Sequence, residues 1–230
     1  MKKITYLLLL AVMALTSFTA CSDDDTTPEV TPTATGTMTD NDGNEYHWVR
    51  IGNLDWMAEN YYGGPTWYNQ NYVTENGLSS TLYADDDDIE AELCKQRGSF
   101  YTYQQAMDQA PEGWRLPTDE EWKQLEMVLG MSRSAADSEG WRDGAGLFLT
   151  KADGFFRLPL AGTIGAYYTA FADRYHDGDY GYYWTATKDT TKDAECVFIR
   201  KVMSNTNKVQ RVACKTIARW MQVRYVRDAK

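Results

Sequence analysis

Two histidines, His47 and His176, are the side chains of this sequence best suited to move a proton near neutral pH. His47 lies in a strand-like segment, where a surface or partly packed histidine is the common case. His176 lies in a loop rich in aspartate and tyrosine, where it could contact a ligand. The sequence contains no Gly-x-Ser-x-Gly, no His-Glu-x-x-His and no phosphate-binding loop motif. We therefore expect neither a catalytic residue nor a cofactor, and we do not expect an enzyme.

Carboxylates gather at three places but lack the spacing of a metal site. Asp40–Glu45 misses the third ligand and the glycine position of an EF-hand loop, and Asp85–Asp88 crowds four charges without ordered spacing. The loop that contains Asp173, Asp177 and Asp179 is longer and no better ordered. Solvated acidic loops explain all three, so we predict no metal site.

Aromatic loops carry the stronger indication of binding. Tyrosine and tryptophan suit stacking on sugar faces or anchoring a protein contact. One cluster follows Tyr61 and another follows Tyr167. The candidate ligand-binding residues are Trp67, Tyr68, Tyr72, Tyr175, His176, Tyr180 and Tyr182. The alternative is that these rings pack irregular loops onto the body of the domain.

Cys21 is predicted to be modified covalently. Lys2 and Lys3 precede an apolar stretch, Ile4–Phe18, that is shorter than the ~20 residues of a spanning helix, so residues 1–20 resemble a signal peptide. Phe18-Thr19-Ala20-Cys21 resembles a lipobox, with phenylalanine where leucine is usual. We expect lipidation of Cys21 with a diacylglycerol and an acyl chain such as palmitate, and anchoring at about 0.8 kcal/mol per buried CH₂. The alternative is an ordinary signal peptide with an incidental cysteine.

The residues after Cys21 predict an exposed tether. Ser22 and Asp23–Asp25 resemble the surface-export signal of Bacteroidetes lipoproteins, although a solvated acidic linker would look the same. Thr26–Thr39 is rich in threonine and proline and is typical of a disordered segment. The expected organisation is a signal peptide over 1–20, a lipidated tether over 21–40 and a folded domain over 41–230. The expected location is the outer membrane, facing the cell exterior.

The charge of the chain excludes nucleic acid as a partner. The formal net charge is −10, which becomes about −12 when Lys2 and Lys3 are removed with residues 1–20, and phosphate binding needs a basic surface. The segment Ala194–Lys230 is an exception, with nine basic residues against Glu195 and Asp228. We favour pairing of this segment with the acidic body; a basic patch for an acidic glycan is the alternative.

The other cysteines are Cys94, Cys196 and Cys214, in a chain expected to reach an oxidising compartment. Ala194–Lys201 and Val209–Lys215 alternate as strands around a turn-like Ser204–Asn207. Centring the turn on Asn205 places Cys196 opposite Cys214, which predicts a cross-strand disulfide.

The elements that must position these residues are short helices and strands. Strand-like segments are Asn44–Ile51, Leu54–Ala58, Gly154–Leu160, Gly181–Lys188 and Met221–Arg227, besides the two cysteine strands. Capping boxes begin helices after Thr102 and Thr118, and the first helix must end before Pro111. In the second helix, Trp122 and two leucines recur at helical spacing toward the core. This layout is typical of an α+β domain.

Separated segments of the chain resemble the Fibrobacter succinogenes major paralogous domain family. They are Tyr46–Asn60 with its Trp-Met-Ala-Glu-Asn, Tyr101–Ala106, Pro111–Trp122 with Gly-Trp-Arg-Leu-Pro-Thr, Gly154–Gly162, Tyr183–Thr187 and Val223–Asp228. The resemblance implies a C-type-lectin-like fold with two short helices, small antiparallel sheets and long loops. Many members of the family carry cysteines where this chain has Ala110 and Tyr225, so a Cys196–Cys214 bridge would replace that pair. The resemblance implies no particular activity.

The functional expectation is a surface-displayed lipoprotein that acts as a non-catalytic binding module for glycan or protein. Its partners would be the membrane, through the lipid, and a glycan or a surface protein. A structural or assembly lipoprotein of the cell envelope is the main alternative, and an unrecognised enzyme is the third.

Overall fold

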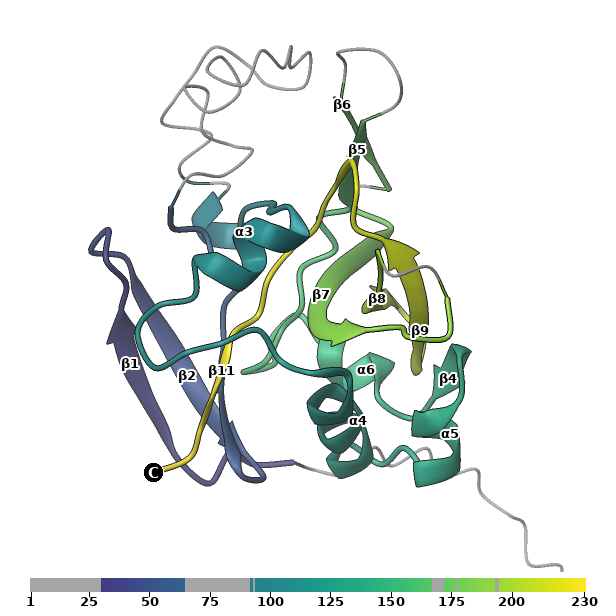
Figure 1. Ribbon diagram of the computed structural model, residues 1–230. Coiled ribbons are helices and arrows are strands. Elements are labelled where there is room, and N and C mark those ends of the chain that lie inside the picture. The colour runs from purple at the N-terminus through teal and green to yellow at the C-terminus, as the bar shows by residue number, and fades with distance from the viewer. Residues whose placement is uncertain (1–29, 65–91, 93, 167–171, 177, 193–194) are drawn as a thin grey trace, which may run out of the picture.

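The computed structural model describes residues 30–64, 92, 94–166, 172–176, 178–192 and 195–230. This part of the chain combines short helices with three small antiparallel sheets, as Figure 1 shows. The predicted α+β class is therefore confirmed.

The first sheet joins the two ends of the described chain, in the order β1-β2-β3-β11. Its strands are β1 (Thr35–Thr39), β2 (Glu45–Ile51), β3 (Leu54–Met57) and β11 (Val226–Asp228). The predicted hairpin of β2 and β3 is confirmed, and it turns at Gly52, whose φ of 63° favours glycine. The predicted tether over 21–40 is wrong at its C-terminal end. β1 belongs to the sheet because its alternate threonines favour a strand, and because it pairs with the edge of β2 that β3 leaves open.

The two predicted helices begin where the capping boxes place them. α3 (Tyr103–Asp108) follows Thr102 and α4 (Asp119–Val128) follows Thr118, and each threonine accepts a backbone N–H three residues later. Two further helices, α5 (Arg133–Asp137) and α6 (Gly146–Thr150), were not predicted. Five residues make little more than one turn, so they leave no helical periodicity in the sequence.

The second sheet has the order β4-β9-β8-β7, and the third has the order β10-β5-β6. The second contains β4 (Gly140–Asp143), β7 (Tyr180–Lys188), β8 (Cys196–Met203) and β9 (Lys208–Lys215). The third contains β5 (Thr163–Ala166), β6 (Ala172–Tyr175) and β10 (Arg219–Trp220). In Figure 1, β1, β2 and β11 lie on the left of the view and β7, β8 and β9 on the right.

Two predicted strands are wrong. Gly154–Leu160 is irregular backbone, and Met221–Arg227 is not continuous. Between β10 and β11 the chain runs through the core and pairs with several segments in turn. Met221 exchanges backbone hydrogen bonds with Tyr101, and the carbonyl of Val223 accepts from the N–H of Tyr61. Apolar composition predicted burial here correctly, but it could not distinguish one long strand from several short pairings.

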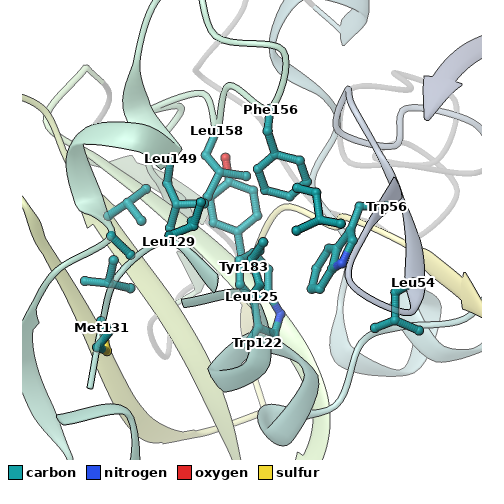
Figure 2. Close-up of a cluster of buried hydrophobic side chains, with 14 of the residues drawn as sticks. Leu54, Trp56, Trp122, Leu125, Leu129, Met131, Leu149, Phe156, Leu158 and Tyr183 are labelled. Carbon is teal, nitrogen blue, oxygen red and sulfur yellow. The ribbon is translucent and has the colours of Figure 1, made fainter. Parts of the chain in front are cut away.

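A core of large side chains lies between the first sheet, α4 and the second sheet. Figure 2 shows Trp56 of β3 beside Trp122 of α4, with Phe156 next to Trp56. The ring centroids of Trp56 and Trp122 are 5.1 Å apart and those of Trp56 and Phe156 are 5.7 Å apart, both in edge-to-face geometry. Trp122, Leu125 and Leu129 are all buried, which confirms the core face predicted for this helix.

Charged groups are buried beside this core, between α4 and the second sheet. Asp119 accepts from Arg200 and Arg211 at 2.7 and 2.8 Å. Glu126 accepts from Arg200 at 2.6 Å and from both terminal nitrogens of Arg142 at 2.7 and 2.8 Å. Two basic residues of the Ala194–Lys230 segment therefore pair with the acidic body, as predicted. We call these five residues the buried charge cluster.

Arg224 is a fully buried guanidinium that binds neutral acceptors. Its Nε and Nη2 donate to Asn60 Oδ1 at 3.0 and 2.7 Å, and Nη1 and Nη2 donate to the carbonyls of Met57, Ala58 and Arg157. Burial lowers the pKa of Arg224 to about 10. The Trp56–Asn60 and Val223–Asp228 motifs, far apart in the sequence, are thus joined by one side chain.

Candidate functional site

One face of the second sheet carries a row of polar and aromatic side chains. Trp141 of β4 is opposite Gln210 of β9, Gln210 is opposite Lys201 of β8, and Lys201 is opposite Tyr182 of β7. Directly paired residues project from the same face of a sheet. Trp141 is 39% exposed and the other three are half-buried. The row therefore lies at the surface.

The same face is covered further along the strands. Trp184 of β7 and Ile199 of β8 are paired, and both are buried in a second core cluster with Tyr101 and Met221. The sheet face is thus divided into a packed half and an open half. The open half is where side chains of this sheet can meet a ligand.

Aromatic rings on the open half surround one lysine. Lys201 Nζ lies 3.6 Å from the ring centroid of Tyr180, 5.1 Å from that of Tyr182 and 5.7 Å from that of Trp141. His176 adjoins both tyrosines, with centroids 5.3 and 6.3 Å away. We call these five residues the aromatic face. Each cation–ring contact is worth on the order of 0.5–2 kcal/mol and holds the ammonium in place.

The surroundings also set the charge states on this face. Burial lowers the pKa of the Lys201 ammonium. Burial raises the pKa of Tyr182 to about 12, with Tyr180 adding to the shift and the charge of Arg219 opposing it. Tyr182 therefore keeps its hydroxyl proton at neutral pH and can donate it to a ligand.

The structure brings together three of the predicted ligand-binding residues, namely His176, Tyr180 and Tyr182. His176 is exposed and has a φ of 62°, so it stands at a sharp backbone turn next to the strand that carries the two tyrosines. Tyr175 lies in β6, and its side chain is outside the described part. Trp67, Tyr68, Tyr72 and the predicted lipidation residue Cys21 also lie outside the described residues.

Other aromatic residues follow the alternative interpretation and pack the body. Tyr61 is buried, and its ring stacks on Tyr46 at 5.5 Å and contacts the edge of Tyr225 at 5.1 Å. Tyr62 packs on Tyr46 at 4.8 Å. In this cluster the rings fill the interior, and they offer no binding surface.

Sequence reasoning missed Trp141 and Lys201. β4 is four residues long, and its alternation of exposed Trp141 and Asp143 with buried Arg142 is too short to stand out. In the sequence, Lys201 is the last residue of a predicted strand and one of the nine basic residues of Ala194–Lys230, and nothing distinguishes it from the others. Pairing of the two predicted strands that became β7 and β8 would have indicated Lys201, because it places Lys201 opposite Tyr182.

The prediction of a Cys196–Cys214 disulfide is wrong, because both thiols are free. β8 and β9 pair one residue out of the predicted register, so Cys196 is opposite Lys215 and Cys214 is opposite Val197. A shift of one residue sends the two side chains to opposite faces of the sheet. β8 ends at Met203 and β9 begins at Lys208, so the turn is centred between Asn205 and Thr206 rather than on Asn205, which adopts a φ of 57°. Cys94 is also free.

A groove of about 610 Å³ lies between the β1–β2 hairpin and the irregular segment that contains Phe155 and Arg157. His47, exposed on β2, faces Glu59, and its Nδ1 is 2.8 Å from Glu59 Oε1. Glu59 Oε2 also accepts the backbone N–H of His47 at 2.8 Å. The carboxylate orients the imidazole, but no hydrogen bond between described residues joins this pair to a hydroxyl or thiol nucleophile.

Within the described ranges, no three histidine, cysteine or carboxylate side chains lie close enough to hold a metal ion. The helices of this part are also too short or too polar to cross a membrane.

Comparison with known proteins identifies a family and no individual relative. No curated protein and no solved structure matches the chain. The model of the Fibrobacter succinogenes major domain matches residues 49–227.

Proposed function

The chain belongs to the Fibrobacter succinogenes major domain family, and we propose that it uses this framework as a non-catalytic binding module for glycans. The observation that carries the proposal is the aromatic face. Trp141, Tyr180 and Tyr182 are partly exposed and lie on strands of the second sheet, so a ligand would meet these three rings already in position.

Sugar rings are a suitable ligand for such a surface. The axial C–H groups of a pyranose pack against an aromatic ring, while its hydroxyls need hydrogen-bond partners at the rim. Trp141 offers the exposed ring, and Tyr182 and Gln210 offer polar groups in the same cross-strand row.

A glycan array followed by calorimetry tests the proposal. Trp141→Ala and Tyr182→Ala should each weaken binding of the retained glycan about tenfold or more, because the first removes the stacking ring and the second a hydrogen-bonding hydroxyl, each worth on the order of 1.4 kcal/mol. Val128→Ala is the matched control, since Val128 is 45% exposed on α4 and lies outside the aromatic face. Retention of no glycan by the protein would sink the proposal. A single dominant protein neighbour in cellular cross-linking would favour an assembly lipoprotein instead.

We propose in addition that the module is anchored by lipid at the outer face of the outer membrane. Support comes from the lipobox-like Phe18–Cys21 and the acidic run Asp23–Asp25. Labelling of cells with an alkyne analogue of palmitate should mark the protein, and Cys21→Ser should abolish the label. Protease added to intact cells should degrade the wild-type domain, while an Asp23–Asp25 alanine variant should become protected.

The finer fold assignment is also a proposal. We propose a C-type-lectin-like arrangement, supported by the return of β11 to the N-terminal hairpin and by α3 and α4 beside small antiparallel sheets. An experimental structure that superposes on a C-type-lectin-like domain through these elements would test it.

A further inference from the structure

The basic residues of the segment Ala194–Lys230 differ in whether a carboxylate pairs with their positive charge. Arg200 and Arg211 bind the buried charge cluster, and Arg227 donates to Asp55 at 3.0 Å. Lys208 is directly opposite Asp143 on the sheet face. The three arginines are compensated by these ion pairs and supply no free charge to a ligand, and the carboxylate of a cross-strand neighbour adjoins Lys208.

Lys201 and Arg219 are different. Within the described part of the chain, neither has a carboxylate within ion-pair distance, and the Lys201 ammonium has no hydrogen-bond acceptor there. Lys201 is nevertheless half-buried among rings. Rings attract a cation through its charge but accept hydrogen bonds poorly, so the N–H donors of Lys201 remain available.

Arg219 belongs to the third sheet, and the chain that follows it runs beside β7. It begins β10, and the N–H of Gln222, three residues later, donates to the carbonyl of Tyr182 at 3.0 Å. The charge of Arg219 acts on Tyr182 of the aromatic face and on Cys214, which lies on the same side of the second sheet but in its packed half. Two uncompensated cations thus flank the rings, on a protein whose net charge is −10.

We propose that the aromatic face selects acidic sugars, with Lys201 and Arg219 binding a carboxylate or sulfate while a ring of the same sugar stacks on Trp141. This proposal rests on the proposed glycan binding and narrows it to one ligand class. A neutral sugar would leave the two cations without a counter-charge. An extended polyanion such as nucleic acid would be repelled by the acidic body of the protein. A single acidic sugar is small enough to interact only with the positive charges of Lys201 and Arg219.

Galacturonate trisaccharide and its fully methyl-esterified form provide a matched pair of probes, because esterification removes the negative charges and adds only one methyl group to each acid. Calorimetry with the full chain at low salt should show at least about tenfold tighter binding of the free acid. Lys201→Met keeps the apolar stem on Tyr180 and should abolish that preference, and Arg219→Gln should reduce it. Lys201→Arg should retain it, which separates loss of charge from loss of folding. Lys151→Met, an exposed lysine on a different part of the surface, is the control and should change nothing.

The outcomes distinguish the two proposals. Equal binding of acid and ester, or a preference that survives in both Lys201→Met and Arg219→Gln, overturns acid selection but leaves glycan binding standing. Binding of neither probe, together with an empty glycan array, removes both proposals. A sulfated trisaccharide that binds in place of the galacturonate, with the same dependence on Lys201, supports the proposal with sulfate as the acid. Equal binding of poly-glutamate would overturn it, since the face would then recognise charge without a sugar ring.

Discussion

The substitution Glu126→Gln examines whether the buried charge cluster holds α4 against the second sheet. Glu126 is fully buried and accepts three hydrogen bonds, two from Arg142 and one from Arg200. Glutamine keeps one carbonyl oxygen and replaces the other with a donor that faces a guanidinium. The substitution removes one negative charge from a cluster of three arginines and two carboxylates, whose side chains are at most 9% exposed.

The expected cost follows from that geometry. Removing one partner of a buried pair leaves an uncompensated charge and costs about 3–5 kcal/mol. For a domain of this size, each kcal/mol lowers the melting temperature by about 2–4 °C, so we expect a decrease of about 6–20 °C. The same change at Glu120 serves as the control. Glu120 lies on the same helix and pairs with Arg133 at 2.6 Å, but the two side chains are 46% and 55% exposed, so its loss should cost about 0–1 kcal/mol.

Urea unfolding followed by tryptophan fluorescence measures both free energies, and scanning calorimetry measures both melting temperatures. The slope of the free energy against urea should be unchanged in both variants, because the exposed surface on unfolding is the same. A decrease below about 1 kcal/mol for Glu126→Gln would refute the reasoning. It would mean that water reaches Arg142 and Arg200, or that the two arginines find other acceptors.

Three further predictions concern the framework. Burial raises the pKa of Asp119, but hydrogen bonds and charge from Arg211 and Arg200 outweigh burial and lower the pKa overall. The ionised carboxylate therefore stabilises the fold above the unfolded pKa of about 3.9, and this stabilisation is lost as pH falls through the folded pKa. Asp119→Asn should accordingly weaken the decrease of the unfolding free energy with falling pH, measured by urea unfolding from pH 6 to 2. Arg224→Lys has three donors in place of five and should cost at least about 2 kcal/mol, with faster amide exchange of the segment around Asn60, because buried acceptors are left unpaired. Lys215→Cys should form a disulfide with Cys196 on mild oxidation, whereas wild-type Cys196 and Cys214 should remain thiols in non-reduced peptide mass spectra.

Local signals in the sequence were enough to locate much of the fold. Thr102 and Thr118 fix the starts of α3 and α4 because a capping box satisfies backbone donors within four residues. Gly52 and its neighbours specify the first hairpin, because the conformation of a two-residue turn depends on the residues within it. The errors occur where partners are distant. The segment before β11 pairs with Tyr101, then Tyr183 and then Tyr61, and no local pattern specifies that order.

The candidate site was predicted in part. Tyr180, Tyr182 and His176 stood out because they lie close together in the sequence and are rich in aromatic surface. Trp141 and Lys201 were missed because their places depend on which strands pair and in which register. The failed disulfide has the same origin, since an error of one residue reverses every side chain of a strand. Composition thus located the aromatic surface, but the pairing of the strands determines which other residues lie on it.

The residues that carry the family resemblance belong to the framework, and those of the aromatic face do not. Arg115 binds Glu121 at 2.6 Å and Arg224 binds Asn60, so these motif residues satisfy one another. The aromatic face lies between the motif segments, at Trp141, His176–Tyr182 and Lys201. A chain with the same motifs would therefore keep the buried hydrogen bonds while changing the rings and cations freely. Membership of the family accounts for how this domain folds, and the proposed glycan binding rests on residues that lie between its motifs.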